Sequence, residues 1–260
     1  MDKVRVASGT NLLSDLSLEL YPSALGFYGD KYKNIIDETL NRTYLYEWTN
    51  QSLLNIMCQI TRSEIKPSQI KKQLEKENTT FGFHYLNKRF LVGMEHFVVV
   101  RNLSNKDEMR AILSHELYGH AVCSTYNNFV TNDYHMCSRN GICFERLQTD
   151  DVINEQANEG MIEYIALQIM HIHNSNYKRD NNKYTYNHAV EAARQLFKYI
   201  GKEKMLELLV CGKDNIENLF DNKNVYSWRS LALELEKKPT EIDIDDHLDG
   251  FVKRYKYENR

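Results

Sequence analysis

Two histidines and a glutamate lie close together in the segment SHELYGH at positions 114–120. Imidazole nitrogens are preferred zinc ligands, and a carboxylate beside them suits a general base acting on a metal-activated water. His115 and His120 are five residues apart, which on an ideal helix turns them about 140° away from each other. A π-type bulge would restore a shared face, and Gly119 lies where this distortion is needed. We therefore expect both histidines to bind one metal ion on a distorted helix, with Glu116 as the base.

The HExxGH pattern of this segment resembles the HELLGH motif of the dipeptidyl peptidase III family of zinc peptidases, in which zinc binding tolerates the same extra residue. The resemblance implies one catalytic Zn²⁺ per chain with His115 and His120 as ligands. It also implies that Glu116 takes a proton from the zinc-bound water and passes it to the leaving amine.

A third zinc ligand is expected on a helix predicted over Asp150–His171, because catalytic zinc usually has three protein ligands. Glu155, Glu159 and Glu163 recur every four residues there and share one face. The string NEGMIEY at 158–164 resembles the NEGFAEY-type segment of aminopeptidase N-like gluzincins. This resemblance implies Glu159 as the third ligand and Glu163 as the acid that orients a ligand histidine.

A second alignment shifts these roles by one helical turn. The string EQAN at 155–158 resembles the ExxAN segment of HExxH peptidases that clear phage-type repressors. The string NEQANE at 154–159 also overlays the EECRAE segment of dipeptidyl peptidase III. Both imply Glu155 as the ligand and Glu159 as the orienting acid. We prefer Glu159 as the ligand.

The oxyanion formed during peptide hydrolysis needs a hydrogen-bond donor besides zinc. Tyr184, Tyr186 and His188 precede or begin a predicted helix and are the candidates. The predicted strand Phe90–Val100 lies just before the motif helix. In gluzincins a strand at that position is an edge strand that pairs with extended substrate.

Spacing of apolar residues predicts the remaining elements. Residues from Asn11 to about Glu77 are predicted to be helical. The Phe- and Val-rich stretches that follow predict strands. His84 and His96 are interpreted as strand residues. The region from Tyr126 to about Gln148 is polar and reads as irregular. The expected helices are Tyr32–Trp48, Gln51–Ile60, a short one from Pro67, Lys106–Cys123 with Ser104 or Asn105 as cap, Asp150–His171, Asn187–Ile200, Lys202–Val210 and Ser227–Glu236; the expected strands are Thr79–Phe83 and Arg89–Val100.

These elements indicate an α+β, mainly helical, zincin-like fold. We expect a single peptidase domain over residues 1–260, with approximate lobes 1–123, containing helices, a small sheet and the motif helix, and 124–260, which is helical and supplies the third ligand.

The bulk composition is that of an ordinary globular protein: 260 residues, 27% of them charged, with a net charge of -3. This balance favours neither a nucleic-acid nor an anionic-membrane partner. The first 20 residues lack signal-peptide features, and the five cysteines are odd in number and irregularly spaced. We therefore expect reduced thiols and a cytoplasmic location, with leaderless secretion as an effector as the alternative.

The motifs favour a peptidase that cleaves a protein substrate internally. Two other functions are compatible with them: an exopeptidase that trims short peptides, and a non-catalytic protein that binds zinc for its structure. Glu116→Gln separates an enzyme, which loses activity and keeps zinc, from a structural site, whose function is unchanged. The substrate, its cleavage preference and the oligomeric state are not predicted by these residues.

Overall fold

The structure is a computed structural model that describes residues 5–8, 11–48, 56, 60, 82–89, 93–127, 137–141, 143–146, 152–153, 155–179 and 187–211. The described residues divide into two compact units. The first comprises residues within Met1–Val122 and Ala166–Tyr177, and the second residues within Cys123–Ile165 and Lys178–Arg260. Each unit is described by itself below.

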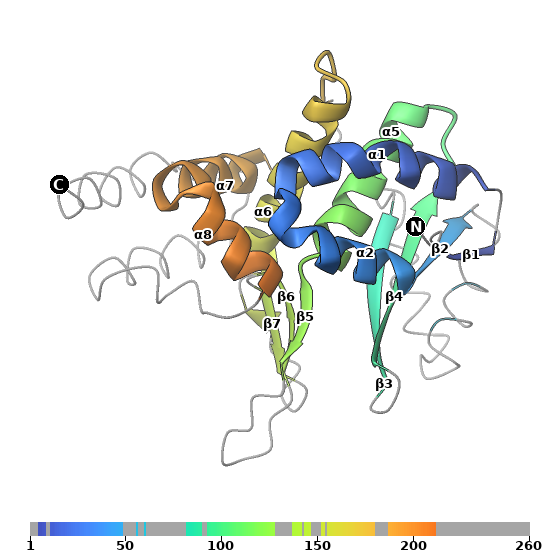
Figure 1. Cartoon of the computed structure of the whole chain (residues 1–260), viewed down its shortest axis with the longest axis horizontal. Helices are drawn as coiled ribbons and strands as arrows, with labels where there is room; N and C mark the ends of the chain where they lie inside the picture. Colours follow the sequence, from blue (N-terminus) through green and yellow to red (C-terminus); the bar gives the residue numbers. More distant parts are fainter. Residues whose placement is uncertain are drawn as a thin grey trace. The chain divides into compact units, whose positions relative to one another are not determined.

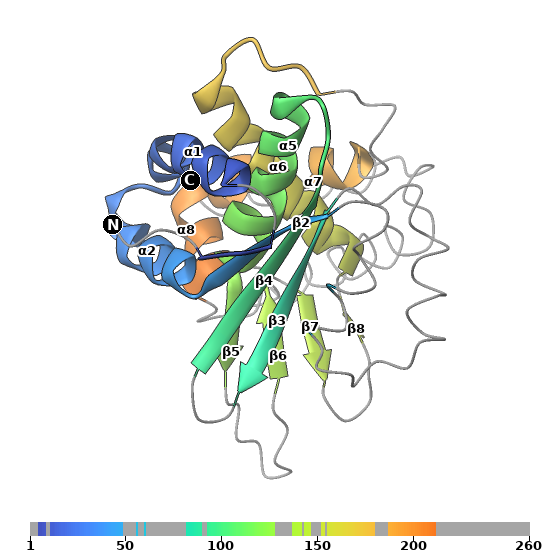
Figure 2. The same cartoon turned by 90° about the vertical axis from the view of Figure 1, so that its right-hand side faces the viewer.

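The first unit is built on a mixed sheet with the strand order β1-β2-β4-β3 (Figures 1 and 2). Its strands are β1 (Arg5–Ser8), β2 (Thr43–Trp48), β3 (Gly82–Arg89) and β4 (Gly93–Arg101). β2 pairs in parallel with both β1 and β4, whereas β3 and β4 are antiparallel neighbours. β3 is therefore the outermost of the described strands on its side of the sheet.

The two faces of this sheet differ in character, because side chains alternate along each strand. One face carries aromatic residues and packs against two isoleucines. Its buried cluster consists of Tyr46, Trp48, Ile56, Ile60, Phe97 and Val99, with Tyr44, Phe83 and Tyr85 half-buried beside it. The opposite face, which includes His96, Val98 and Val100 on β4, is also buried.

Helices of the first unit are α1 (Leu12–Tyr28), the short turn η1 (Asp30–Tyr32), α2 (Lys33–Asn41) and α5 (Lys106–Leu113), which continues as η2 (Ser114–Ala121). α1 lies beside α5, and η2 contacts β3, β4 and α2 (Figure 1). The apolar face of the motif helix is buried throughout: Met109, Ile112, Leu113, Leu117 and Ala121.

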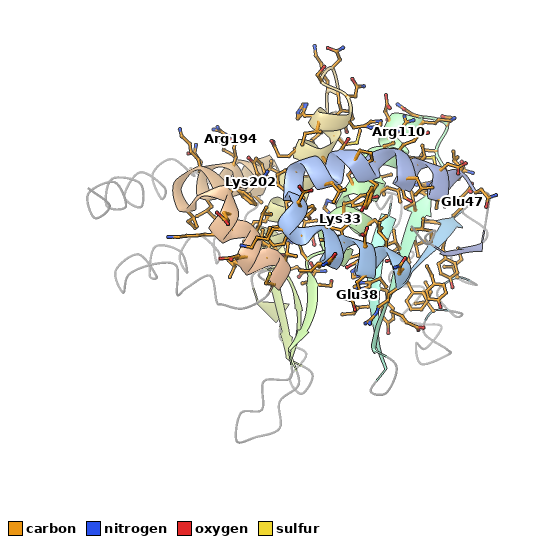
Figure 3. All side chains as sticks on the ribbon, in the orientation of Figure 1. Lys33, Glu38, Glu47, Arg110, Arg194 and Lys202 are labelled. Atoms are coloured by element: carbon orange, nitrogen blue, oxygen red, sulfur yellow. The ribbon has the colours of Figure 1, made fainter. Side chains whose placement is uncertain are left out.

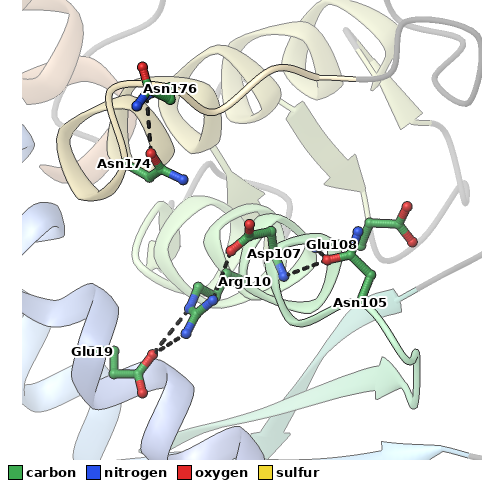
Figure 4. Close-up of polar contacts among 7 residues, drawn as sticks. All are labelled: Glu19, Asn105, Asp107, Glu108, Arg110, Asn174 and Asn176. Atoms are coloured by element: carbon green, nitrogen blue, oxygen red, sulfur yellow. Dashed lines mark hydrogen bonds and ion pairs between the residues drawn. The ribbon is translucent and has the colours of Figure 1, made fainter.

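The start of α5 is fixed by polar contacts (Figure 4). The side chain of Asn105 accepts hydrogen bonds from the backbone N–H groups of Asp107, at 2.9 Å, and Glu108, at 3.4 Å. One of the two predicted cap residues is therefore confirmed. Arg110 then joins two helices, since its guanidinium contacts Glu19 on α1 at 2.6 Å and Asp107 at 2.8 Å.

The second unit combines a small antiparallel sheet with helices. The sheet has the order β5-β6-β7-β8, formed by β5 (Ser124–Asn127), β6 (Cys137–Asn140), β7 (Cys143–Arg146) and β8 (Val152–Ile153). The helices are α6 (Glu155–His173), whose C-terminal part belongs to the first unit, α7 (Asn187–Ile200), α8 (Lys202–Leu206) and η3 (Glu207–Cys211).

Buried asparagines and a glycine join α6 to this sheet. Asn158 on α6 donates to Asn140 at 3.3 Å, and Asn140 donates to the Ser124 hydroxyl at 3.0 Å. Gly141 follows with a φ of +57°, a left-handed conformation in which a Cβ would lie 2.2 Å from the Asn158 side chain. This turn therefore requires glycine.

Several predicted elements differ from the structure. The predicted helix Tyr32–Trp48 is wrong beyond Asn41, because Thr43–Trp48 is strand β2. The region expected to be irregular after Tyr126 holds strands β6 and β7, so the C-terminal part of the chain is not purely helical. The predicted helix from Asp150 begins at Glu155, after β8.

Other predicted elements agree closely with the structure or lie outside it. α7 spans the predicted Asn187–Ile200, and α8 with η3 covers the predicted Lys202–Val210. The helix predicted from Pro67, the helix Ser227–Glu236 and all of Gln51–Ile60 except Ile56 and Ile60 lie outside the described residues.

Charged side chains lie on the outer surfaces of the helices, where Figure 3 draws them. Ion pairs one helical turn apart join Lys33 to Asp37 and Arg42 to Glu38, and all four side chains are at least 28% exposed. Such exposed pairs contribute little to stability. In the part of the chain that the structure describes, no helix combines the length and the apolar character needed to span a membrane.

Candidate metal centre

The motif helix changes its winding where the chemistry-bearing residues begin. α5 is α-helical as far as Leu113, and Ser114–Ala121 is π-helical. At its end the backbone N–H of Val122 bonds to the carbonyl oxygen of Leu117, five residues earlier, at 3.3 Å. The predicted distortion is therefore confirmed, although it extends over eight residues and not over a single bulge.

The π-helical winding brings the two histidines to one face, since residues five apart are bonded within one turn of such a helix. The Nε2 atoms of His115 and His120 lie 3.1 Å apart. Two nitrogen ligands on a tetrahedral zinc, each at about 2.05 Å, would be about 3.3 Å apart. The observed spacing therefore fits a shared metal ion.

Glu116 belongs to the same group. The ligand atoms of His115, Glu116 and His120 all lie within 4.8 Å of one another. The two histidines are half-buried, whereas Glu116 is 7% exposed. A buried carboxylate beside two imidazoles can hold a proton close to a metal-bound ligand.

The edge strand β3 passes directly over this group at Gly82. A Cβ at Gly82 would lie 2.5 Å from the Cγ2 of Ile112 and 3.2 Å from the Cγ of Glu116. Only a residue without a side chain allows β3 to approach the motif helix this closely. Gly82 therefore allows β3 to lie directly beside Glu116.

Tyr118, in the middle of the motif, is a structural residue. Its ring is fully buried, and its hydroxyl group donates to the carbonyl oxygen of Ser17 on α1 at 2.6 Å. Burial raises the pKa of Tyr118, so the hydroxyl stays protonated and keeps donating. This bond ties the π-helical segment to α1.

Sequence reasoning did not anticipate that two strand histidines adjoin this group. His84 is on β3 and His96 is on β4, as expected, and their rings form a hydrogen bond. The ring of His84 also stacks on that of His120. The available signal was the two-residue alternation, which places Gly82 and His84 on one face of β3.

The predicted acidic ligands lie on α6 in the second unit. Glu159 is half-buried and Glu155 is exposed. Glu163 is buried, and its carboxylate forms an ion pair with Nε of Arg179 at 3.1 Å. The pairing of Glu163 with an arginine was not foreseen. The roles of Glu159, or alternatively Glu155, as third ligand and of Glu163 as orienting acid stay predictions.

The neighbours of Glu159 in the NEG string have structural roles. Asn158 holds the sheet turn through Asn140. A Cβ at Gly160 would lie 2.4 Å from the backbone of Ala189, so this glycine allows α6 and α7 to cross closely. Two of the three residues in the string are thus explained by packing within the second unit.

The candidate oxyanion donors are not tested by the structure. Tyr184 and Tyr186 lie outside the described residues, and only the backbone of His188, in α7, is described.

The expectation for the substrate-binding strand is corrected. β4, which contains most of the predicted strand Phe90–Val100, lies inside the sheet between β2 and β3. Both of its edges are already paired, so β4 cannot accept a further strand. Among the described strands, β3 is the outermost one beside His115, Glu116 and His120.

No protein-family model matches the sequence, and neither the characterised proteins nor the solved structures include a match to it.

Proposed function

We propose that this protein is a zinc-dependent peptidase of the zincin type, with His115 and His120 as ligands of one Zn²⁺. The observation that supports this most strongly is the π-helical segment Ser114–Ala121, which holds the two Nε2 atoms 3.1 Å apart. π-helical segments are rare and frequently lie at functional sites. The winding of this one places two histidines five residues apart on one face, which is the arrangement that a shared metal ion needs.

Bound zinc supplies a Lewis acid that lowers the pKa of a coordinated water and polarises a carbonyl group. The residues of the chain contribute orientation and proton transfer. The Glu116 carboxylate lies within 4.8 Å of both imidazole ligand atoms, where it would take a proton from the attacking water and pass it to the leaving amine. Because Glu116 is buried, little bulk water competes for that proton.

The position of β3 favours an endopeptidase. This strand spans Gly82–Arg89, pairs with β4 along its whole length and is outermost among the described strands of its sheet. An extended substrate that adds to the outer edge of β3 would run past Glu116 and His120. Its backbone would form hydrogen bonds with the backbone of β3 at several positions. Such binding suits an internal segment of a protein better than a short free peptide.

We also propose that Glu159 is the third zinc ligand and that the substrate is a peptide or protein. The proposed location is the cytoplasm. Cys123 and Cys211 are thiols and not disulfides, which is typical of a reducing compartment.

Metal content and activity of matched variants test this function. We expect about one zinc per chain in the wild type, retained in Glu116→Gln and lost in His115→Ala and His120→Ala. His171→Ala, at an exposed position of α6, is the control histidine variant and should keep its zinc. Elemental analysis after dialysis against metal-free buffer measures this directly.

Activity is measured on a library of internally quenched peptides whose two ends are blocked. Cleavage by the wild type, with at least a 100-fold loss in Glu116→Gln, would support an endopeptidase. Cleavage only of peptides with a free amino terminus would identify the exopeptidase instead. A wild type that takes up no zinc when it is supplied would refute the proposal.

A further inference from the structure

Four imidazoles of the first unit form a continuous row that ends at the proposed metal ligands. Nδ1 of His96 on β4 lies 3.0 Å from Nε2 of His84 on β3. The ring of His84 is parallel to that of His120 within 4°, with centroids 6.2 Å apart. His120 then meets His115 through their Nε2 atoms.

The register of β3 and β4 explains why the first two rings meet. His84 is paired with Val98, and His96 is two residues from Val98 along β4. His84 and His96 therefore lie diagonally on the same face of the sheet, within reach of long or aromatic side chains. Gly82, two residues before His84, brings this part of β3 against the motif helix.

A second metal site at the His84–His96 pair is not favoured. Among the residues that the structure describes, the one group of three close metal-binding side chains is His115, Glu116 and His120. The 3.0 Å contact between the two ring nitrogens is an N–H···N hydrogen bond, which occupies one nitrogen of each ring.

We propose that His84 is a positioning residue for the metal ligand His120, and that His96 holds His84 in place. This inference rests on the proposed function, because it takes His120 as a ligand. A ligand imidazole must keep one ring orientation, which proteins usually fix by a hydrogen bond to its second nitrogen. In this protein the parallel ring of His84 adds a second constraint on that orientation.

The row limits rotation at two points. Rotation of His120 about its ring torsion would end the parallel arrangement with the ring of His84. His84 cannot turn without breaking its 3.0 Å bond to His96, which is 2% exposed and packed inside the sheet. Loss of such outer contacts typically weakens metal binding about 10- to 100-fold.

Metal binding by the full-length chain tests the inference with Zn²⁺ and Co²⁺ as probes. Affinity for Zn²⁺ is measured by competition with a chromophoric chelator, and the visible absorption of the Co²⁺ form reports the ligand geometry. We expect His84→Leu to weaken Zn²⁺ binding by about 10- to 100-fold and to alter the Co²⁺ spectrum. His84→Phe keeps a flat ring beside His120 and should recover most of both properties.

Tyr85→Leu is the matched control, because Tyr85 is next along β3 but faces the aromatic cluster on the other side of the sheet. It should leave Zn²⁺ affinity and the Co²⁺ spectrum unchanged. Equal weakening in Tyr85→Leu, no rescue by His84→Phe, or wild-type binding in His84→Leu would each overturn the positioning role alone. A wild type that binds neither metal would overturn the proposed function as well.

Discussion

The hydroxyl group of Tyr28, the last residue of α1, donates a hydrogen bond to the backbone carbonyl oxygen of Tyr118 within the π-helical segment. The hydroxyl group of Tyr118 donates to the carbonyl oxygen of Ser17 on the same α1 helix. The two tyrosines thus form reciprocal bonds between the helices. Because π-helical winding displaces carbonyl groups from their α-helical partners, a donor from outside the segment stabilises the distorted form.

We expect Tyr28→Phe to reduce the free energy of unfolding by about 1–3 kcal/mol, because it removes the hydroxyl donor from a buried carbonyl group. It should also weaken Zn²⁺ binding, since the spacing of His115 and His120 depends on the π-helical winding. Urea unfolding of the metal-free protein and a Zn²⁺ titration measure the two effects.

Tyr21→Phe is the control for this substitution. Tyr21 is also on α1, but its hydroxyl group donates to Asp37 at a partly exposed position. We expect its loss to change stability by no more than about 0.5 kcal/mol. An equal loss of stability and zinc affinity in both variants would argue against a specific role for the Tyr28–Tyr118 bond.

The central part of the site was predictable from local sequence. The order of His115, Glu116, Gly119 and His120 predicted the clustering of these side chains and the helical distortion, and the cap at Asn105 marked the start of the helix. These features depend on residues within one helix. Helical periodicity and capping carry that information directly.

Features that depend on distant partners were missed. β2 was read as helix because Ile36 and Leu40 have helical spacing, yet Thr43–Trp48 is extended through parallel pairing with β4, some fifty residues later. The strands β5 to β7 are short and mostly polar, and β8 has only two residues, so none shows an apolar alternation. Tertiary pairing overrides local propensity in such segments.

Gly82→Ala tests the close approach of β3 to the motif helix. Its Cβ would lie 2.5 Å from Ile112 Cγ2 and 3.1 Å from the carbonyl oxygen of Val99, so the strand or the helix must shift. We expect a loss of about 1–3 kcal/mol in stability, typical of overpacking. Ile112→Ala removes the opposing Cγ2 atom with the rest of the side chain beyond Cβ. The double variant Gly82→Ala/Ile112→Ala should therefore lose less stability than the sum of the two single variants. Strictly additive losses in a double-mutant cycle would contradict this contact.

Two helical glycines should respond to alanine with opposite signs. Gly160 faces the backbone of Ala189 at 2.4 Å, so Gly160→Ala should separate α6 from α7 and destabilise the protein by about 1–3 kcal/mol. Gly26 on α1 is exposed and has only an ordinary 3.6 Å contact with Ile172. Gly26→Ala should therefore stabilise by about 0.5–1 kcal/mol through helix propensity. Thermal unfolding of the two variants measures both effects. Stabilisation in both would show that crowding at Gly160 is not decisive, and destabilisation in both would contradict the propensity argument for Gly26.

The stability of the metal-free protein should fall as the pH is lowered from about 6.5 to about 4. The pKa of His96 is lowered from 6.5 to about 4 in the folded protein, chiefly by burial and secondly by Arg42. Between these values the unfolded chain binds a proton that the folded protein excludes, so acid favours unfolding. Protonation of His96 is expected to lower the free energy of unfolding by about 3 kcal/mol. This loss is complete once the pH is below the folded pKa of about 4.

Urea unfolding at several pH values, in the presence of a chelator, measures this dependence. His96→Leu should reduce the slope between pH 4 and 6.5 without abolishing it, because burial also lowers the pKa of His84. His171→Leu, at an exposed position, should leave the slope unchanged. An unchanged slope in His96→Leu would mean that other groups cause the acid sensitivity.

Removal of metal should destabilise the wild type and have no effect on ligand variants. Zn²⁺ at 100 times its dissociation constant is expected to raise the free energy of unfolding by about 2.7 kcal/mol, because it binds the folded state alone. A chelator should reverse the gain, and His115→Ala and His120→Ala should show neither change. Glu116→Gln should keep the full zinc-dependent gain if Glu116 acts as a base and not as a ligand. A gain that disappears with Glu116→Gln would instead make this carboxylate a member of the ligand set, and the assignment of its proton-transfer role would have to be abandoned.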